Sequence, residues 1–268
     1  MRTSEDSDAP RRVAIRATVR RFSQLRAAPT LLALFVALVV WVGITANQIV
    51  PAYMLPPPGK VAAAWTQILL NGALWKHVSA TLSEALLGFA LAFVIGVALA
   101  YPLARSETLA SLMSPFIAAT QAMPMIALAP LLVVWFGLGL SSKVLICALI
   151  VFFPILVNTV VGLRSIDHEM LDAARTLGAG RWQLLRYVEV PLSLRTLLGG
   201  IRMGLTLAMT GAVVGEFVAA DAGLGFLMVL ARTNFDASML FAASLTMAGI
   251  SILAYTTVGW LEHRLIDW

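Results

Sequence analysis

The stretch EMLDAARTLGAGRWQLLRYVEVPLSL, from Glu169 to Leu194, is a long polar interruption in an otherwise apolar chain. Of the 268 residues, 60% are hydrophobic and only 12% are charged, and the mean hydropathy is +0.88. Soluble globular domains carry about 25% charged residues. The composition therefore predicts an α-helical integral membrane protein in which this stretch connects two membrane segments.

Membrane-crossing helices are predicted where about 20 consecutive residues avoid charge, the length that crosses about 30 Å of hydrocarbon. The predicted spans are Ala28–Ala46, Ala80–Leu103, Phe116–Leu138, Val144–Leu163, Leu194–Ala220 and Leu240–Leu261. The first is too long for a cleavable signal peptide and is not followed by an A-x-A site, so we expect it to be retained. A six-span membrane domain over 28–268 then follows a basic tail over 1–27.

Lysine and arginine are unevenly placed along the chain. Most of the 19 basic residues fall in the tail 1–27 and in the loop 164–193, which contains the opening stretch. Because cytoplasmic loops hold the excess of Lys and Arg, both termini and this loop are predicted to be cytoplasmic. The net charge of +5 then reflects topology, and no nucleic-acid partner is expected. The tail is either a basic helix on an anionic leaflet or a flexible basic segment.

The residues that would carry enzymatic chemistry are missing. The sequence has no G-x-x-x-x-G-K-[ST] phosphate loop, no H-E-x-x-H zinc motif and no G-x-S-x-G elbow, and its three histidines lie in different regions. Cys147, the single cysteine, falls inside the fourth predicted span and is expected to be buried apolar filling. We therefore expect no catalysis, metal or cofactor, and a protein that moves a solute across the membrane.

Small residues share one face of the fifth predicted span. At 3.6 residues per turn the glycines and Ala208 lie within a sector of about 80°. Such a face lets another backbone approach closely, either within the bundle or across a sliding or dimer-forming surface. The glycines are Gly200, Gly204, Gly211 and Gly215.

Polar and proline residues inside two spans are candidates for a translocation path. In the third span, prolines interrupt a hydrophobic run beside an amide and a methionine, which predicts a pore-lining segment or a structural kink. In the fifth span, Glu216 lies outside the glycine sector and either lines the path or reaches the outer interface. Glu84, near the outer start of the second span, is expected to reach the outer interface. The candidate path residues are Gln121, Met123, Pro124, Pro130, Met209 and Glu216.

The loop 164–193 has the local signals of two short helices. Asp167 is a suitable N-cap for the first, and the glycines from Gly178 to Gly180 end it. The second, RWQLLRYVEV, is predicted to stop before Pro191. Two short helices joined by glycines form a rigid projection rather than an unstructured connection.

A family resemblance follows from this loop. Asp172-Ala173-Ala174, then Gly178, then nine residues before Val188-x-Val190-Pro191 resembles the E-A-A-x-x-x-G-x9-I-x-L-P motif of the membrane subunits of ATP-binding-cassette (ABC) importers. Asp replaces the usual Glu, and valines replace Ile and Leu. From Leu55 onward, MLPPPGKV, PMIALAPLLVVWFGLG and GEFVAADAGLGFLM are similar to the nitrate, sulfonate and taurine permease branch.

The resemblance implies a type I importer permease of a bacterial inner membrane. Two permease copies would pair, a soluble binding protein would deliver the solute, and cytoplasmic subunits would bind ATP and Mg²⁺. The helix from Asp172 to Gly178, with Ala173, Ala174 and Pro191 in its motif, would couple to those ATPases.

The solute is expected to be small and polar or anionic, such as a sulfonate, nitrate or taurine, or else a thiamine precursor or another vitamin. These residues do not show which solute is transported, or whether the two paired permeases are a homodimer or a heterodimer. A secondary transporter or channel without an ATPase is the competing class, and would require charge pairs or ion-site carboxylates inside the membrane, of which the sequence offers few.

Overall fold

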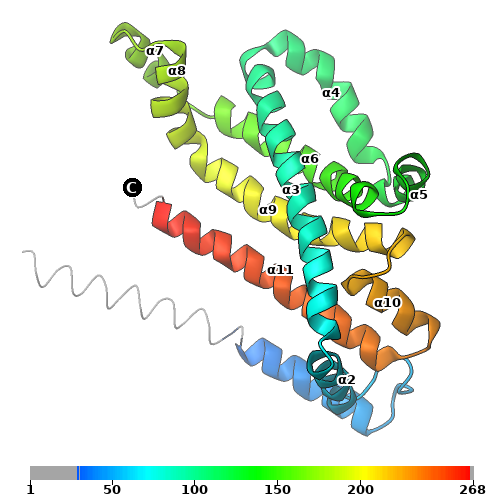
Figure 1. Ribbon diagram of the computed structural model, residues 1–268. Coiled ribbons are helices and arrows are strands. Elements are labelled where there is room, and N and C mark those ends of the chain that lie inside the picture. The colour runs from blue at the N-terminus through cyan, green and yellow to red at the C-terminus, as the bar shows by residue number, and fades with distance from the viewer. Residues whose placement is uncertain (1–28, 30, 266–268) are drawn as a thin grey trace, which may run out of the picture. The chain divides into compact units, whose positions relative to one another are not determined.

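The computed structural model describes residue 29 and residues 31–265, and every regular element in these ranges is a helix (Figure 1). The described chain forms two compact units that divide after Val61. The basic tail predicted over 1–27 lies outside the described residues. Its role and the predicted domain boundary at residue 28 therefore stay predictions.

The first unit contains one apolar helix, Leu31–Ala46, within the first predicted span. Its described part is shorter than the roughly 20 residues that cross a bilayer. The indole N–H of Trp41 donates to the carbonyl oxygen of Pro56 at 3.0 Å, which ties the end of this helix to the proline run. Helix α2 (Pro58–Leu70) starts at that run, where proline suits a first helical position because its missing N–H has no helical partner there.

The second unit contains most of α2 and all of the remaining helices. Four are long and apolar enough to cross a membrane: α3, α6, α11, and a continuous helical segment from Arg181 to Val218 that ends with α9. The helices are α3 (Ala73–Arg105), α4 (Glu107–Ala122), α5 (Met125–Phe136), α6 (Leu140–Arg164), α7 (His168–Thr176), α8 (Arg181–Leu184), the π-helical turn η1 (Leu185–Glu189), α9 (Val190–Val218), α10 (Leu224–Thr233) and α11 (Ala237–Leu265).

The third predicted span, Phe116–Leu138, is wrong as a single helix. The chain forms α4 and α5 instead, and Met123 between them is extended, with φ −73° and ψ 134°. Pro124 is the cause, since a proline pushes the residue before it out of the helical region and lacks the N–H that would continue the helix. The structure thus contains a break where the sequence predicted a bend.

The core lies where α3, α6 and α9 pack together (Figure 1). It is built mainly from small residues, including Ala85 of α3 and Ala208 of α9, and Cys147 of α6 is fully buried among them. The Cys147 thiol lies 3.3 Å from the carbonyl oxygen of Ala208. The prediction of a buried, filling cysteine is confirmed.

The glycine face of α9 lies against α6. A Cβ added at Gly211 would be 2.8 Å from Cys147 Cα, and one added at Gly215 would be 3.2 Å from Lys143 Cα. A Cβ at Gly200 would be 2.9 Å from Asn158 Cβ. These distances are shorter than ordinary Cβ contacts, so glycine is what lets the two backbones approach this closely within one chain.

Candidate functional site

The 164–193 loop projects from one end of the second unit, where α7 and α8 lie (Figure 1). Asp167 caps α7 by accepting a hydrogen bond from the Glu169 N–H at 2.9 Å, as predicted. Leu171 turns inward and is buried with Ile166 and Leu184. This small apolar cluster fixes α7 on α8, so the loop has a core of its own.

The end of α7 is a Schellman motif, which explains the glycine at its centre. The Gly178 N–H donates to the Arg175 carbonyl at 2.9 Å, and the Ala179 N–H donates to the Ala174 carbonyl at 3.1 Å. Gly178 adopts φ +87°, a left-handed conformation that favours glycine. The prediction that glycines end this helix is confirmed.

The outer face of the loop carries the motif residues. Asp172 and Ala173 are exposed, whereas Ala174 is half-buried against the small cluster. Large apolar side chains elsewhere on the loop are exposed as well, and exposed apolar surface of this kind is typical of a binding surface. They are Met170, Leu177, Trp182 and Tyr187.

The prediction that the second helix of the loop stops before Pro191 is wrong. The helix continues from Arg181 into α9 through the π turn η1, where the Val190 N–H bonds to the Leu185 carbonyl five residues earlier. Pro191 lies directly after η1, where the regular bonding to the carbonyl four residues earlier is already interrupted, so its missing N–H is tolerated there. The wider turn absorbs the proline, so the loop and α9 form one continuous helix.

Polar contacts attach the loop to the bundle. The Arg105 guanidinium at the end of α3 pairs with the buried Glu189 of η1. Arg164, at the end of α6, donates to the Leu103 carbonyl of α3 at 3.0 Å. The ion pair therefore holds the loop to α3, and the Arg164 hydrogen bond joins α3 to the end of α6, where the loop begins.

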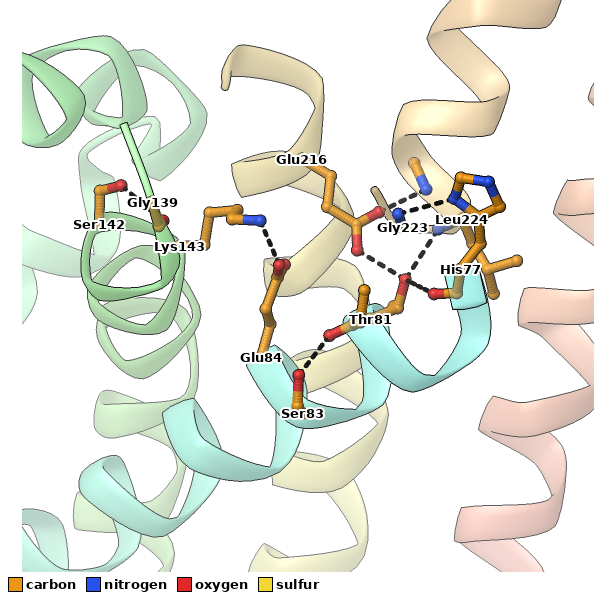
Figure 2. A network of polar contacts seen from close by, with 12 residues as sticks. His77, Thr81, Ser83, Glu84, Gly139, Ser142, Lys143, Glu216, Gly223 and Leu224 are labelled. Carbon is orange, nitrogen blue, oxygen red and sulfur yellow. Dashed lines mark hydrogen bonds and ion pairs between the residues drawn. The ribbon is translucent and has the colours of Figure 1, made fainter. Parts of the chain in front are cut away.

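A polar network lies at the opposite end of α9, around the start of α10 (Figures 1 and 2). The Gly223 N–H donates to His77 Nδ1 at 3.0 Å, and the Leu224 N–H donates to the Thr81 hydroxyl at 2.8 Å. The first N–H groups of a helix have no partners within it. Side chains of α3 therefore provide the acceptors that the start of α10 needs.

Glu216 completes this network. Its carboxylate accepts hydrogen bonds from the Thr81 hydroxyl at 2.6 Å and from the Gly225 N–H. An added Cβ at Gly223, whose φ is +126°, would be 2.2 Å from the Glu216 carboxyl carbon. The glycine thus makes room for the carboxylate, which also lies favourably at the positive end of the α10 dipole. Glu216 is buried here and does not reach an interface.

An ion pair between Glu84 and Lys143 lies beside Glu216 (Figure 2). Both side chains are buried, Glu84 with 2% and Lys143 with 7% of its side-chain surface exposed. The predicted snorkelling of Glu84 to the outer interface is therefore wrong. The physical reason is that a lysine from α6 meets the carboxylate inside the bundle, which lowers the cost of burying both charges.

A cavity of about 610 Å³ lies where α4, α5, α6 and α9 meet. Of the candidate path residues, Pro124 lines it. Met123 and Pro130 are exposed, Met209 is buried in the core, and the side chain of Gln121 lies outside the described part of the structure. Phe153, Asn158 and Thr210 line the cavity too, and no signal in the sequence singled them out, because they become neighbours only through packing.

Solved structures identify the class of fold. The chain is similar to a chain of the inward-facing MetNI methionine ABC transporter, with a TM-score of 0.65 at 19% identity over 75% of this chain and 97% of the other. The fold is thus that of an ABC importer permease. A model of the binding-protein-dependent transport system inner membrane component family matches residues 92–267, and the chain belongs to that family.

Individual relatives cover most of the chain. The riboflavin transport system permease protein RibX of Chloroflexus aurantiacus is 51% identical over 88% of both chains. The formylaminopyrimidine transport permease protein ThiX of Halalkalibacterium halodurans is 36% identical over 90% of this chain and 95% of its own. The taurine transport system permease protein TauC of Escherichia coli is 31% identical over 88% and 87%. The resemblance to ABC importer permeases is therefore confirmed.

Proposed function

We propose that α7 is the coupling helix through which a cytoplasmic ATPase drives solute import, and that two copies of the chain form the path. The observation that carries this proposal is the construction of the 164–193 loop. Its outer face presents Asp172 and Ala173, while its inner face is anchored by Leu171. A projection that has its own core, and continues into α9, transmits a displacement that a flexible loop would absorb.

In this arrangement the loop, both termini and the ATPases lie on the cytoplasmic side, and the chain crosses the membrane six times. Four long helices, the helix Leu31–Ala46 and the broken α4–α5 pair supply the segments. A binding protein delivers the solute to the other side, where the α10 network lies. ATP and Mg²⁺ are bound by the partner ATPases, since the chain has no phosphate-binding motif.

The solute is a small polar molecule, and two chemistries have support. The relative named for riboflavin is 51% identical and the one named for formylaminopyrimidine is 36% identical, which supports a vitamin-like solute. The relatives named for taurine and for aliphatic sulfonates, at 31% and 30%, support an anionic or zwitterionic one.

Gly178→Val tests the coupling role. A β-branched residue is strongly disfavoured at φ +87°, so the end of α7 should be displaced while the membrane helices stay folded. We expect solute uptake to fall at least about tenfold, and ATP hydrolysis to lose its stimulation by loaded binding protein. Gly180→Val is the matched control, because Gly180 has φ −72° and a Cβ there makes only an ordinary contact. Normal uptake by Gly178→Val would refute the proposal.

Ala173→Trp tests the docking surface itself. Ala173 is exposed, so a large side chain should leave the fold of the chain intact and obstruct only a partner that approaches closely. We expect the ATPase to be lost when the complex is purified through the permease, with an unchanged amount of permease in the membrane. Because only a cytoplasmic loop can meet that ATPase, retention of the ATPase would count against both the site and the orientation.

A further inference from the structure

We propose that the cavity between α4, α5, α6 and α9 is the passage site for an uncharged, planar heteroaromatic solute rich in hydrogen-bond donors. This inference rests on the proposed import function and narrows its solute class. The cavity of about 610 Å³ falls in the range of roughly 300–1,000 Å³ that is typical of small-molecule sites. It is the meeting point of the broken α4–α5 pair and the two central helices.

The charge of the cavity wall argues against an anionic solute. Among the described residues, none that lines this cavity is charged. The ion pairs between Glu84 and Lys143 and between Arg202 and Glu262 involve no residue that lines the cavity. A sulfonate or nitrate ion would lose its hydration here without meeting a cation, which is strongly unfavourable. A neutral solute has no such cost.

Two side chains supply unused polar atoms. The Asn158 side-chain N–H donates to the Pro154 carbonyl at 2.8 Å, which leaves its side-chain carbonyl oxygen without a hydrogen bond among the described residues. The Thr210 hydroxyl also has no partner in the described part of the chain, unlike Thr206 one turn earlier, which bonds to the Arg202 carbonyl at 3.1 Å. Asn158 and Thr210 both line the cavity and are available to a ligand.

Prolines leave carbonyl groups without their helical partner in residues that line the same cavity. Each of three prolines lacks the N–H that would bond to the carbonyl four residues earlier, and each of those earlier residues lines the cavity. Helix breaks of this kind inside membranes are tolerated where the freed backbone groups face a polar path. The pairs are Pro124 with Thr120, Pro130 with Ile126, and Pro154 with Ile150. Acceptors therefore outnumber donors, which favours a solute with N–H and O–H groups.

Phe153 gives the cavity a surface for a flat ring. Phe152 holds it in an edge-to-face arrangement, with the ring centroids 4.8 Å apart and the planes at 75°. Met203, on the cavity wall, is half exposed and brings a polarizable thioether to the same space. Aromatic and thioether groups bind planar rings well and hydrated anions poorly.

Riboflavin is a suitable probe because its fluorescent ring is uncharged and carries an imide N–H and a hydroxylated side chain. The full-length chain, reconstituted in lipid nanodiscs without binding protein, should quench riboflavin fluorescence on binding. A hundredfold excess of taurine should not displace it. Thr210→Val should weaken binding about five- to tenfold through the loss of one hydrogen bond, and Phe153→Leu by a similar factor.

Thr206→Val is the matched control, since it removes a hydroxyl from the same helix that does not line the cavity. It should bind riboflavin as the unmodified chain does. Unaltered binding by Thr210→Val, competition by taurine, or no binding because lipid or the second permease copy fills the cavity would each overturn the inference. Gly178→Val should still bind riboflavin here, so a failure at this cavity is distinguishable from a failure of coupling at α7.

Discussion

Replacing Lys143 with methionine is expected to lower the free energy of unfolding by about 3–5 kcal/mol. The change leaves the Glu84 carboxylate buried with no opposing charge, and one of its oxygens already lacks a hydrogen bond among the described residues. Desolvating an unpaired carboxylate costs far more than removing one half of a surface ion pair would. The measurement is thermal unfolding of the purified chain in detergent, followed by loss of helical circular dichroism.

Lys76→Met is the control for this substitution. Lys76 is an exposed lysine near the start of α3, so the same chemical change there should have little effect on stability. Adding Glu84→Gln to Lys143→Met should recover most of the lost stability, because it removes the unpaired charge. Equal stability of the two lysine variants, or no rescue by Glu84→Gln, would show that the pair does not hold α3 and α6 together.

Gly211→Leu is expected to separate α6 from α9. Even the first carbon of the new side chain would lie 2.8 Å from Cys147 Cα, a backbone atom that cannot move aside without shifting α6. Overpacking typically costs about 1–3 kcal/mol, and a backbone contact places this variant at or above the upper end. The yield of folded protein in detergent and its unfolding midpoint should both fall.

Gly199→Leu provides the comparison on the same helix. A Cβ at Gly199 meets nothing within 4 Å, and leucine has a better helix propensity than glycine. We expect this variant to match or slightly exceed the unmodified chain in stability. Similar losses in both variants would mean that the damage comes from altered membrane insertion rather than from the α6 contact.

The local architecture of the 164–193 loop could be predicted from the sequence. The Asp167 cap and the Gly178 turn depend on residues within a few positions of one another, and each has a specific backbone role. The small face of α9 was also visible, because helical periodicity alone places its glycines together. What the sequence did not contain was the identity of the surface that this face meets.

Features that depend on packing between distant segments could not be predicted. Glu84 and Lys143 are far apart in the chain, and no local pattern indicates that they pair, so Glu84 was expected to reach the interface. The cavity was only partly anticipated, since the prolines were recognised but Asn158 and Thr210 were not. Pro191 misled the boundary prediction because a π turn, which has no sequence signature here, absorbs it.

The continuous helix from Arg181 to Val218 has a further consequence. It extends over 38 residues, roughly 57 Å at 1.5 Å per residue, from the loop that carries α7 to the carboxylate that holds α10. A single helix of this length connects its two ends mechanically, because a rotation at one end is passed along the helix to the other. Under the proposed coupling, a displacement of α7 would reach Glu216 through this one element, whose irregular point is the π turn η1.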